Sequence, residues 1–301
     1  MRNSSSSPDG VLRHAVLGAG GVGLSLASDL ARAGQHVTLV MRPQSLMHYN
    51  GVVRVLRPER STATFAVPAV ARLAELVDVV WIAVKQPQLL HALGSLDAAA
   101  STSALVISLL NGIDHMNPLR SMYGPRAVAG AIRVEACRES IGTVVRKSLF
   151  TELDLAFPHP GHPVVPRIAK SLRTAGIACR TDLDEATVLW GKLSLLAPLA
   201  LATTCAGGPL KMVRQNPELA RLMTKCVREV CAVAATEGVV LHESRLIRCL
   251  SIMPDRSSSS LQRDSAVGAP LELEAISTPV LRAAVHTPAT EELVRRARSA
   301  V

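Results

Sequence analysis

The chain has 301 residues, enough for two domains of ordinary size, and a hydrophobic content of 48%, enough to fill their cores, which excludes a disordered or fibrous protein. The formal net charge of +9 predicts a surface that attracts anions, but aromatic residues make up only 2% of the chain, which favours a small anionic ligand over nucleic acid. The six cysteines show neither a C-x-x-C pair nor zinc-site spacing, which indicates reduced thiols in a cytoplasmic protein without a metal site.

The first residues of the chain are polar and rich in serine. Residues 1–12 lack the apolar core of a secretory signal, so they predict a disordered tail. An uncharged stretch between Lys192 and Lys211 is the candidate for a membrane span. It is short for that purpose and contains Pro198 and Pro209, which favours a buried core helix. We therefore expect no membrane association.

The first half of the chain alternates short runs rich in valine and isoleucine with helical patterns, which is typical of parallel βαβ units. We expect a Rossmann-type α/β N-terminal domain over residues 13–181. The expected elements are strands at 14–17, 36–40, 52–56, 77–84, 104–108 and 127–131, a helix at 22–33 that ends at Gly34, a more antiparallel ending at 142–145 and 151–156, a helix to about residue 174 and a short strand near 178–180.

The second half has a different pattern of hydrophobic residues, because strand-like alternation largely disappears after residue 182. Helical periodicity marks residues 184–204, 216–236 and 272–285, and a serine-rich loop at 255–260 separates helices. Arginines and glutamates close to the C-terminus predict a solvated face of the last helix. We therefore expect a mostly α-helical C-terminal domain over residues 182–301.

A G-x-G-x-x-G motif directly follows the first expected strand and opens the first expected helix. Gly18 would allow a tight turn, Gly20 the close approach of a pyrophosphate, and Gly23 close packing of the helix. Gly21 and Val22 lie between them, at the helix N-terminus that would face the phosphates. A plain glycine-rich turn is the alternative, but strand, spacing and helix agree. The motif therefore predicts a dinucleotide site.

The residue at the end of the second expected strand bears on the choice of dinucleotide. NAD-dependent enzymes tend to carry an acidic residue there, whereas this chain has Arg42, which fits the 2′-phosphate of NADP. An ordinary surface arginine is the alternative, but the position at the strand end favours the functional interpretation. Lys85 and Gln88 follow an apolar run, at the carboxyl edge of a strand where ligands collect in open α/β sheets. Together these residues predict NADP, in the form of NADPH, as the cofactor.

These motifs, taken in order, resemble those of the ketopantoate reductase family over nearly the whole chain, from about Arg13 to Arg296. GAGGVG at 18–23, together with Arg42, is similar to the start of the family's NADP-binding domain. VKQPQ at 84–88 is similar to its lysine motif, and LLNGI at 109–113 to its asparagine-glycine motif. LWGKL at 189–193 resembles the segment with the family's catalytic lysine, and SLQRDSAVGAPLELEAI at 260–276 resembles its serine-to-glutamate motif.

The resemblance implies a Rossmann domain followed by a helical domain, and hydride transfer from NADPH to the keto carbon of a 2-keto acid. The usual substrate is ketopantoate, which gives pantoate for pantothenate biosynthesis. On this basis Lys192 and Glu272 are the expected catalytic residues, and Asn111 and Ser260 are expected to bind the substrate. Asn111 and Glu272 are also expected at the cofactor.

The chemistry of these side chains suits those roles. Hydride addition builds negative charge on the carbonyl oxygen, which a lysine ammonium can stabilise and protonate. Apolar neighbours such as Trp190 would lower the pKa of Lys192 toward use as an acid. The alternatives are structural: a lysine at a helix edge, a helix-start glutamate at Glu272, a capping serine at Ser260 and an ordinary Asn-Gly turn at Asn111.

Two positions depart from the family's pattern. Members that reduce ketopantoate commonly carry asparagines one and two helical turns after the catalytic lysine, where this chain has Leu196 and Ala200. A more apolar 2-keto acid is therefore an alternative substrate. A non-catalytic NADP-binding sensor is an alternative of another class, although a sensor would need neither Lys192 nor Glu272. A homodimer is left open as the assembly.

Overall fold

The computed structural model of the chain describes residues 11–57, 61–148 and 151–299. The chain divides into two compact units, each with its own hydrophobic core. The N-terminal unit comprises the residues up to 110 together with 115–185. The C-terminal unit comprises 111–114 together with the residues from 186 onward, so a short segment of the first half belongs to the second unit.

An eight-stranded sheet forms the centre of the N-terminal unit, in the order β12-β11-β8-β7-β6-β1-β2-β5. β11 runs antiparallel to β8, and the other neighbouring strands are parallel. The chain passes from β1 to β2 and β5 and then returns to β6, which places the topological switch point between β1 and β6. The expected α/β Rossmann-type fold is confirmed. The strands are β1 (Arg13–Leu17), β2 (His36–Val40), β5 (Ala69–Val70), β6 (Val79–Ile82), β7 (Leu105–Ser108), β8 (Ala127–Arg133), β11 (Thr151–Ala156) and β12 (Ile177–Arg180).

A second, four-stranded sheet has the order β4-β3-β10-β9. The strand expected at 52–56 exists, but it belongs to this sheet and not to the parallel one. It pairs antiparallel with β4 and parallel with β10. Residues 57–61 separate β3 from β4, which is too few for the crossover that a parallel pair would need. The strands are β3 (Val52–Leu56), β4 (Thr62–Ala66), β9 (Ala136–Ser140) and β10 (Thr143–Arg146).

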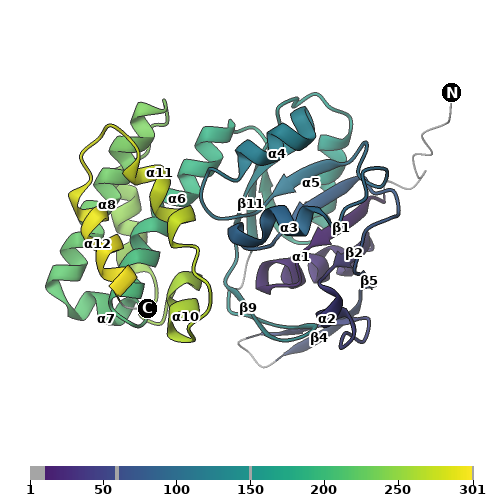
Figure 1. Ribbon diagram of the computed structural model, residues 1–301, viewed down its shortest axis with the longest axis horizontal. Coiled ribbons are helices and arrows are strands. Elements are labelled where there is room, and N and C mark those ends of the chain that lie inside the picture. Colours follow the sequence, from purple (N-terminus) through teal and green to yellow (C-terminus); the bar gives the residue numbers. More distant parts are fainter. Residues whose placement is uncertain (1–10, 58–60, 149–150, 300–301) are drawn as a thin grey trace. The chain divides into compact units, whose positions relative to one another are not determined.

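The helix α1 (Gly21–Arg32) packs against strands of both sheets (Figure 1). Its buried Asp29 accepts hydrogen bonds from Nη1 of Arg146 on β10 at 2.8 Å, and Nη2 of Arg146 donates to Thr151. Burial raises the pKa of Asp29, and the Arg146 charge opposes that shift. This ion pair connects α1 to the second sheet. The other helical segments of the unit are α2 (Pro43–Leu46), η1 (Gln86–Gln88), α3 (Leu89–Leu93), α4 (Met116–Tyr123), η2 (Gly124–Arg126) and α5 (Val164–Thr174).

The last residue of the expected N-terminal tail belongs to the folded N-terminal unit. Residues 1–10 of that segment lie outside the described residues. Leu12, however, is fully buried in the core of the N-terminal unit, and its N–H donates to Oε1 of Gln35 at 3.0 Å. The prediction of a tail through residue 12 is therefore wrong at its end, because Leu12 packs against residues that follow α1.

The described part of the C-terminal unit is helical. The helices expected at 184–204 and 216–236 are present almost as predicted, whereas the helix expected at 272–285 ends at Leu281. Figure 1 shows α8 beside α12, and the two helices pack against each other. The helices are α6 (Glu185–Cys205), α7 (Leu210–Gln215), α8 (Pro217–Thr236), α9 (Glu243–Ile252), α10 (Ser260–Ala266), α11 (Leu273–Leu281) and α12 (Pro288–Ser299).

The helix α6 is long and apolar enough to cross a membrane by length and composition alone. However, 67% of its apolar window is buried inside the structure. Trp190, Leu193 and Leu201 belong to the core of the C-terminal unit, and Pro198 lies within the helix. These features are those of the core helix that the sequence predicts.

Candidate active site

The glycine motif forms the turn between β1 and α1. Gly18 has a φ of +110°, and a Cβ atom there would lie 2.8 Å from the carbonyl oxygen of Ala83. The Gly18 N–H donates to the carbonyl of Val40 at the end of β2, at 3.0 Å. A Cβ atom at Gly23 would overlap the carbonyl oxygen of Gly18, so α1 packs directly on the turn. Only glycine satisfies both positions without strain.

The N-terminus of α1 is open on one side and closed on the other. A Cβ atom at the helix-capping Gly20 would have the Ala83 carbonyl oxygen, 4.0 Å away, as its nearest neighbour. At Gly21 it would instead overlap the carbonyl oxygen of Ala136 in β9. Among the described residues, no side chain caps this end of α1. The first turn of the helix, which includes Val22, has no acidic residue. The open side and the helix N–H groups fit a pyrophosphate.

Arg42 lies two residues beyond the end of β2, at the N-cap position of α2. Its side chain is exposed, and no ion pair within the described part of the chain engages it. Arg32 and Arg146 of the same unit, by contrast, both pair with Asp29. The guanidinium of Arg42 is thus available to an anionic ligand.

Lys85 and Gln88 follow β6, the strand next to β1 on the other side of the switch point. Lys85 is half-buried at the N-cap position of η1, and its carbonyl accepts a hydrogen bond from the N–H of Gln88 at 2.9 Å. Gln88 is exposed. Ala83, two residues before Lys85, touches Gly18, so both predicted residues lie at the same carboxyl edge as the glycine turn.

A buried histidine also lies in β1, although sequence reasoning assigned it no role. His14 is 1% exposed, and Nε1 of Trp81 on β6 donates to its Nδ1 at 3.1 Å. Burial lowers the pKa of His14 to about 4, against the raising effects of Gln35 and Asp78. The imidazole is therefore neutral near pH 7 and serves as an internal acceptor.

The C-terminal unit brings Asn111 and Glu272 together. Nδ2 of Asn111 donates to Oε2 of Glu272 at 3.2 Å, and the Glu272 side chain is only 6% exposed. Gly112 has a φ of +83°, and a Cβ atom there would overlap the carbonyl oxygen of Ala275 in α11. An ion pair between Asp114 and Arg282 attaches the other end of the 111–114 segment. The Asn-Gly turn is thus built to approach α11.

Lys192 lies in the first half of α6, and its side chain is half-buried. Its neighbours Trp190 and Leu193 are buried in the core, where Nε1 of Trp190 donates to Oε2 of Glu237 at 2.9 Å. One turn after Lys192, Leu196 is half-buried, and two turns after it Ala200 is fully buried in the core. The face that continues from the lysine along α6 is therefore apolar.

Ser260 is the first residue of α10 and is half-buried. The capping role that the sequence leaves open for it falls instead to Ser259, whose Oγ accepts from the N–H of Gln262 at 3.0 Å. Oγ of Ser259 also lies 3.0 Å from Oγ1 of Thr203, which fixes the start of α10 against α6. The hydroxyl of Ser260 is not the one that caps the helix.

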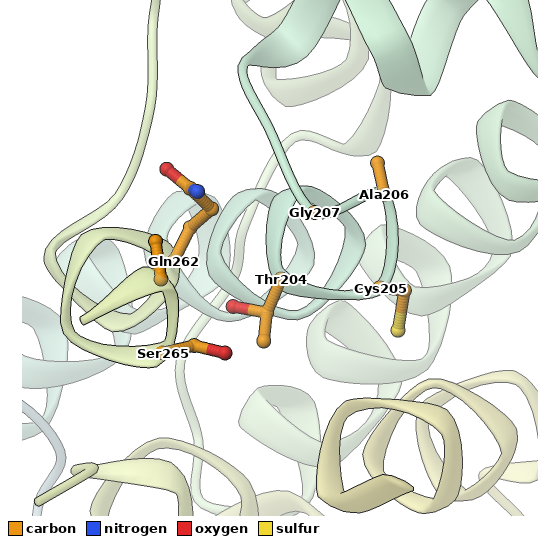
Figure 2. Close-up of a pocket in the computed structure, with 7 residues that line it drawn as sticks. Thr204, Cys205, Ala206, Gly207, Gln262 and Ser265 are labelled. Carbon is orange, nitrogen blue, oxygen red and sulfur yellow. The ribbon is translucent and has the colours of Figure 1, made fainter. Parts of the chain in front are cut away.

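A pocket of about 260 Å³ lies between the end of α6 and α10 (Figure 2). Gln262 and Ser265 line it from α10, and Thr204 and Cys205 line it from α6. Oε1 of Gln262 accepts from Ser258, and Oγ1 of Thr204 donates within α6, so both polar side chains are partly engaged. The seven described lining residues include none of the predicted site residues.

The described part of the chain shows no candidate metal centre, and burial keeps two of its thiols protonated. No three His, Cys, Asp or Glu side chains gather there in a way that could hold a metal ion. The cysteines are free. Burial raises the pKa of the Cys226 thiol to about 12 and that of the Cys205 thiol to about 11, so both stay protonated near pH 7.

The predicted residues thus fall into two sets. The N-terminal unit gathers the glycine turn, Arg42 and Lys85 around the carboxyl ends of β1, β2 and β6. The C-terminal unit joins Asn111 to Glu272 and carries Lys192 and Ser260 on two further helices. The sequence did not predict the close approach of the Ala136 carbonyl to Gly21. The two residues are more than a hundred positions apart, so no local pattern indicates that they meet.

Two family models match the chain in succession. The model described as "Ketopantoate reductase PanE/ApbA" matches residues 14–155, and the model described as "Ketopantoate reductase PanE/ApbA C terminal" matches residues 185–299. A 2-dehydropantoate 2-reductase of Caulobacter vibrioides is 28% identical over 291 residues, which cover 92% of this chain and 93% of that protein. Both kinds of match span the two units.

Solved structures share the fold. The PanE/ApbA family ketopantoate reductase of Ralstonia eutropha JMP134 has a TM-score of 0.85 and 26% identity, covering 96% of this chain and 98% of that one. A D-mandelate dehydrogenase, solved with NADH and anilino(oxo)acetate, has a TM-score of 0.84 and 17% identity at the same coverage. At that identity the second likeness concerns the fold alone.

Proposed function

The chain belongs to the ketopantoate reductase family of nicotinamide-dependent oxidoreductases acting on CH–OH groups, and on that premise we propose that it reduces a 2-keto acid with NADPH. Ketopantoate, giving pantoate for pantothenate biosynthesis, is the first candidate substrate. The free thiols support a reducing compartment, and we place the reaction in the cytoplasm. The homodimer left open by the sequence is to be tested by light scattering.

The contact between Asn111 and Glu272 carries this proposal. Their polar atoms lie 3.2 Å apart although the residues are 161 positions apart in the chain. A 6% exposed carboxylate that accepts an amide hydrogen bond is a positioned group, which a solvated helix-start glutamate would not be. We assign to Glu272 the role of orienting a substrate hydroxyl or the Lys192 ammonium.

The proposed roles follow from the charges of the reaction. When bound, NADPH supplies the hydride to the keto carbon. The ammonium of Lys192 stabilises the charge that develops on the carbonyl oxygen and donates the proton that completes the hydroxyl group. Ser260 donates a hydrogen bond to the substrate, and Asn111 holds Glu272 in place. The half-buried setting of Lys192 beside Trp190 limits the water that would compete for this proton.

The preference for NADPH over NADH rests on Arg42. Its unengaged guanidinium near the end of β2 suits the 2′-phosphate, and Gly18, Gly20 and Gly23 supply the turn for the pyrophosphate. Lys85 and Gln88 add polar side chains at the same carboxyl edge of the sheet. Titration with NADPH and NADH, followed by protein fluorescence, tests the preference. Equal affinity for the two would contradict it.

A second candidate substrate is a 2-keto acid with an apolar side chain. Leu196 favours it, because this half-buried side chain one turn after Lys192 cannot hydrogen-bond a polar substrate. Ala200 is fully buried in the core and therefore does not bear on the choice. The D-mandelate dehydrogenase structures show that this fold also occurs in an enzyme named for an aromatic substrate.

The decisive experiment is a substrate panel with purified protein and NADPH, followed by the loss of NADPH absorbance. The panel contains ketopantoate, 3-methyl-2-oxobutanoate, phenylglyoxylate and pyruvate. Turnover of ketopantoate with the highest kcat/KM supports the first candidate, and a preference for phenylglyoxylate or 3-methyl-2-oxobutanoate supports the second. Tight NADPH binding without turnover of any member would favour a non-catalytic sensor.

A further inference from the structure

A 2-keto acid carries a carboxylate that a reductase must hold, and the roles proposed above leave that group without a cationic partner. Lys192 is assigned to the carbonyl oxygen. Between Lys192 and Thr203, α6 offers no charged side chain, and the hydroxyl of Ser194 is buried and donates to the carbonyl of Gly191 at 3.1 Å. The partner of the carboxylate must therefore come from another element.

The helix α10 presents two different faces. Leu261 is 1% exposed and packs into the core, while Gln262, Ser265 and Ala266 line the pocket seen in Figure 2. Successive residues of a helix are rotated by about 100°, so residues three apart lie on one face. Ser260 and Arg263 therefore share a face that lies away from the core residue Leu261 and borders the pocket at Ala266, three residues after Arg263.

Arg263 differs in its surroundings from the paired arginines of this unit. Arg214, Arg228 and Arg282 each pair with a carboxylate. No carboxylate pairs with Arg263 among the described residues, its sequence neighbour Asp264 included. Its Nη1 atom is nevertheless withdrawn from solvent and lacks a hydrogen-bond partner in that part of the chain. A buried guanidinium N–H without an acceptor is costly, and a ligand that accepts its hydrogen bond relieves that cost.

We propose that Arg263, with Ser260 one turn before it, binds the carboxylate of the 2-keto acid substrate; this inference rests on the proposed function. The planar guanidinium donates two parallel N–H bonds to a carboxylate, and the serine hydroxyl adds a third donor. Arg263 is then a specificity-determining residue that distinguishes a keto acid from a neutral keto ester. The bond between Ser259 and Thr203 holds the start of α10 in place.

The test compares Arg263→Gln and Arg263→Lys with a matched control, Arg256→Gln. Arg256 is an exposed arginine in the loop before α10. Each protein is assayed with 3-methyl-2-oxobutanoate and with its methyl ester. Arg263→Gln is expected to raise KM for the acid by about 10- to 100-fold with a smaller change in kcat, while the value for the ester hardly moves. Arg263→Lys keeps the positive charge but loses the two parallel N–H donors of the guanidinium. Its KM for the acid is expected to lie between those of the unaltered protein and Arg263→Gln.

A second readout does not depend on turnover. Calorimetric titration of each NADPH-loaded protein with oxamate, an unreactive analogue of a 2-keto acid, should show the same loss of affinity in Arg263→Gln and none in Arg256→Gln. Unchanged NADPH affinity shows that the variant is folded, and if Arg263→Gln does not fold, Arg263→Lys carries the comparison.

The possible failures are distinguishable. If the unaltered protein binds oxamate or turns over a keto acid and Arg263→Gln matches Arg256→Gln, the carboxylate assignment is overturned and the proposed function stands. If the unaltered protein neither binds oxamate nor reduces any member of the panel, both are overturned.

Discussion

The two units position their predicted functional residues in different ways. In the N-terminal unit the backbone sets the geometry, since Gly18 and Gly23 allow a turn and a close approach that any side chain would block. In the C-terminal unit side chains from separate segments set it, as in the contact of Asn111 with Glu272. A backbone site is tied to a short sequence motif, whereas a side-chain site depends on packing between distant segments.

The difference has a functional consequence. If the N-terminal unit serves only the cofactor and the C-terminal unit only the substrate and its protonation, changes in one unit should leave the other property intact. The following predictions test that separation, in order of decreasing effect.

Replacing Lys192 by alanine should change activity the most. Loss of the proton donor is expected to lower kcat by about 10²- to 10⁴-fold while the affinity for NADPH stays nearly unchanged. Steady-state kinetics and a fluorescence titration with NADPH check the two halves of this prediction. Lys211→Ala, at an exposed lysine of α7, is the control. Equal turnover of the two variants would remove Lys192 from the mechanism.

Acid should destabilise the N-terminal unit through His14. The folded-state pKa of about 4 lies below the ordinary value of 6.5, so the neutral, folded form is fully favoured above about pH 6.5 and loses that advantage as the pH falls to about 4. The expected cost is about 3 kcal/mol of the free energy of unfolding. Hydrogen exchange resolved by peptide should show the loss in β1 and β6 first. In His14→Gln the dependence on pH should be weaker; an identical dependence would contradict the assignment.

The glycine turn should respond to a single methyl group. Gly18→Ala places a Cβ atom against Ala83 at a positive φ, and should cost about 1–3 kcal/mol of stability together with most of the NADPH affinity. Gly34→Ala is the matched control, because Gly34 also has a positive φ, +75°, but a Cβ atom there would meet nothing within 4 Å beyond its own chain neighbours. It should cost about 1 kcal/mol and leave NADPH binding unchanged. Thermal melts and cofactor titration measure both effects, and equal behaviour of the two variants would refute the close-approach argument.

Arg42 should affect only the choice of cofactor. Arg42→Asp is expected to shift the ratio of NADPH to NADH affinity by about tenfold or more toward NADH, since an acidic residue suits the ribose 2′-hydroxyl and repels a 2′-phosphate. Arg173→Asp, at an exposed arginine of α5, controls for the change in net charge. An unchanged ratio would show that Arg42 does not determine the preference for NADPH.

How far the sequence predicts the structure differs between elements for physical reasons. Strand β2 and helix α5 are readable because local patterns mark them: an apolar run that follows Gly34, and a segment bounded by prolines and Gly176. The strand at 52–56 can also be predicted from its local pattern. Its pairing cannot, because β10 is far from it in the chain. The capping serine of α10 escapes prediction in the same way, since no local signal separates Ser259 from Ser260.

Local sequence is enough for the order of most of the elements and for the glycine turn between β1 and α1. These features depend on neighbours within a few residues, through periodicity, turn geometry and motif spacing. Tertiary packing was needed to show that residues 111–114 belong to the C-terminal unit, that Glu272 accepts a hydrogen bond from Asn111, and that the Nη1 atom of Arg263 is withdrawn from solvent. The reason is physical: such contacts form when distant segments bury their apolar faces together, and no local pattern encodes their partners.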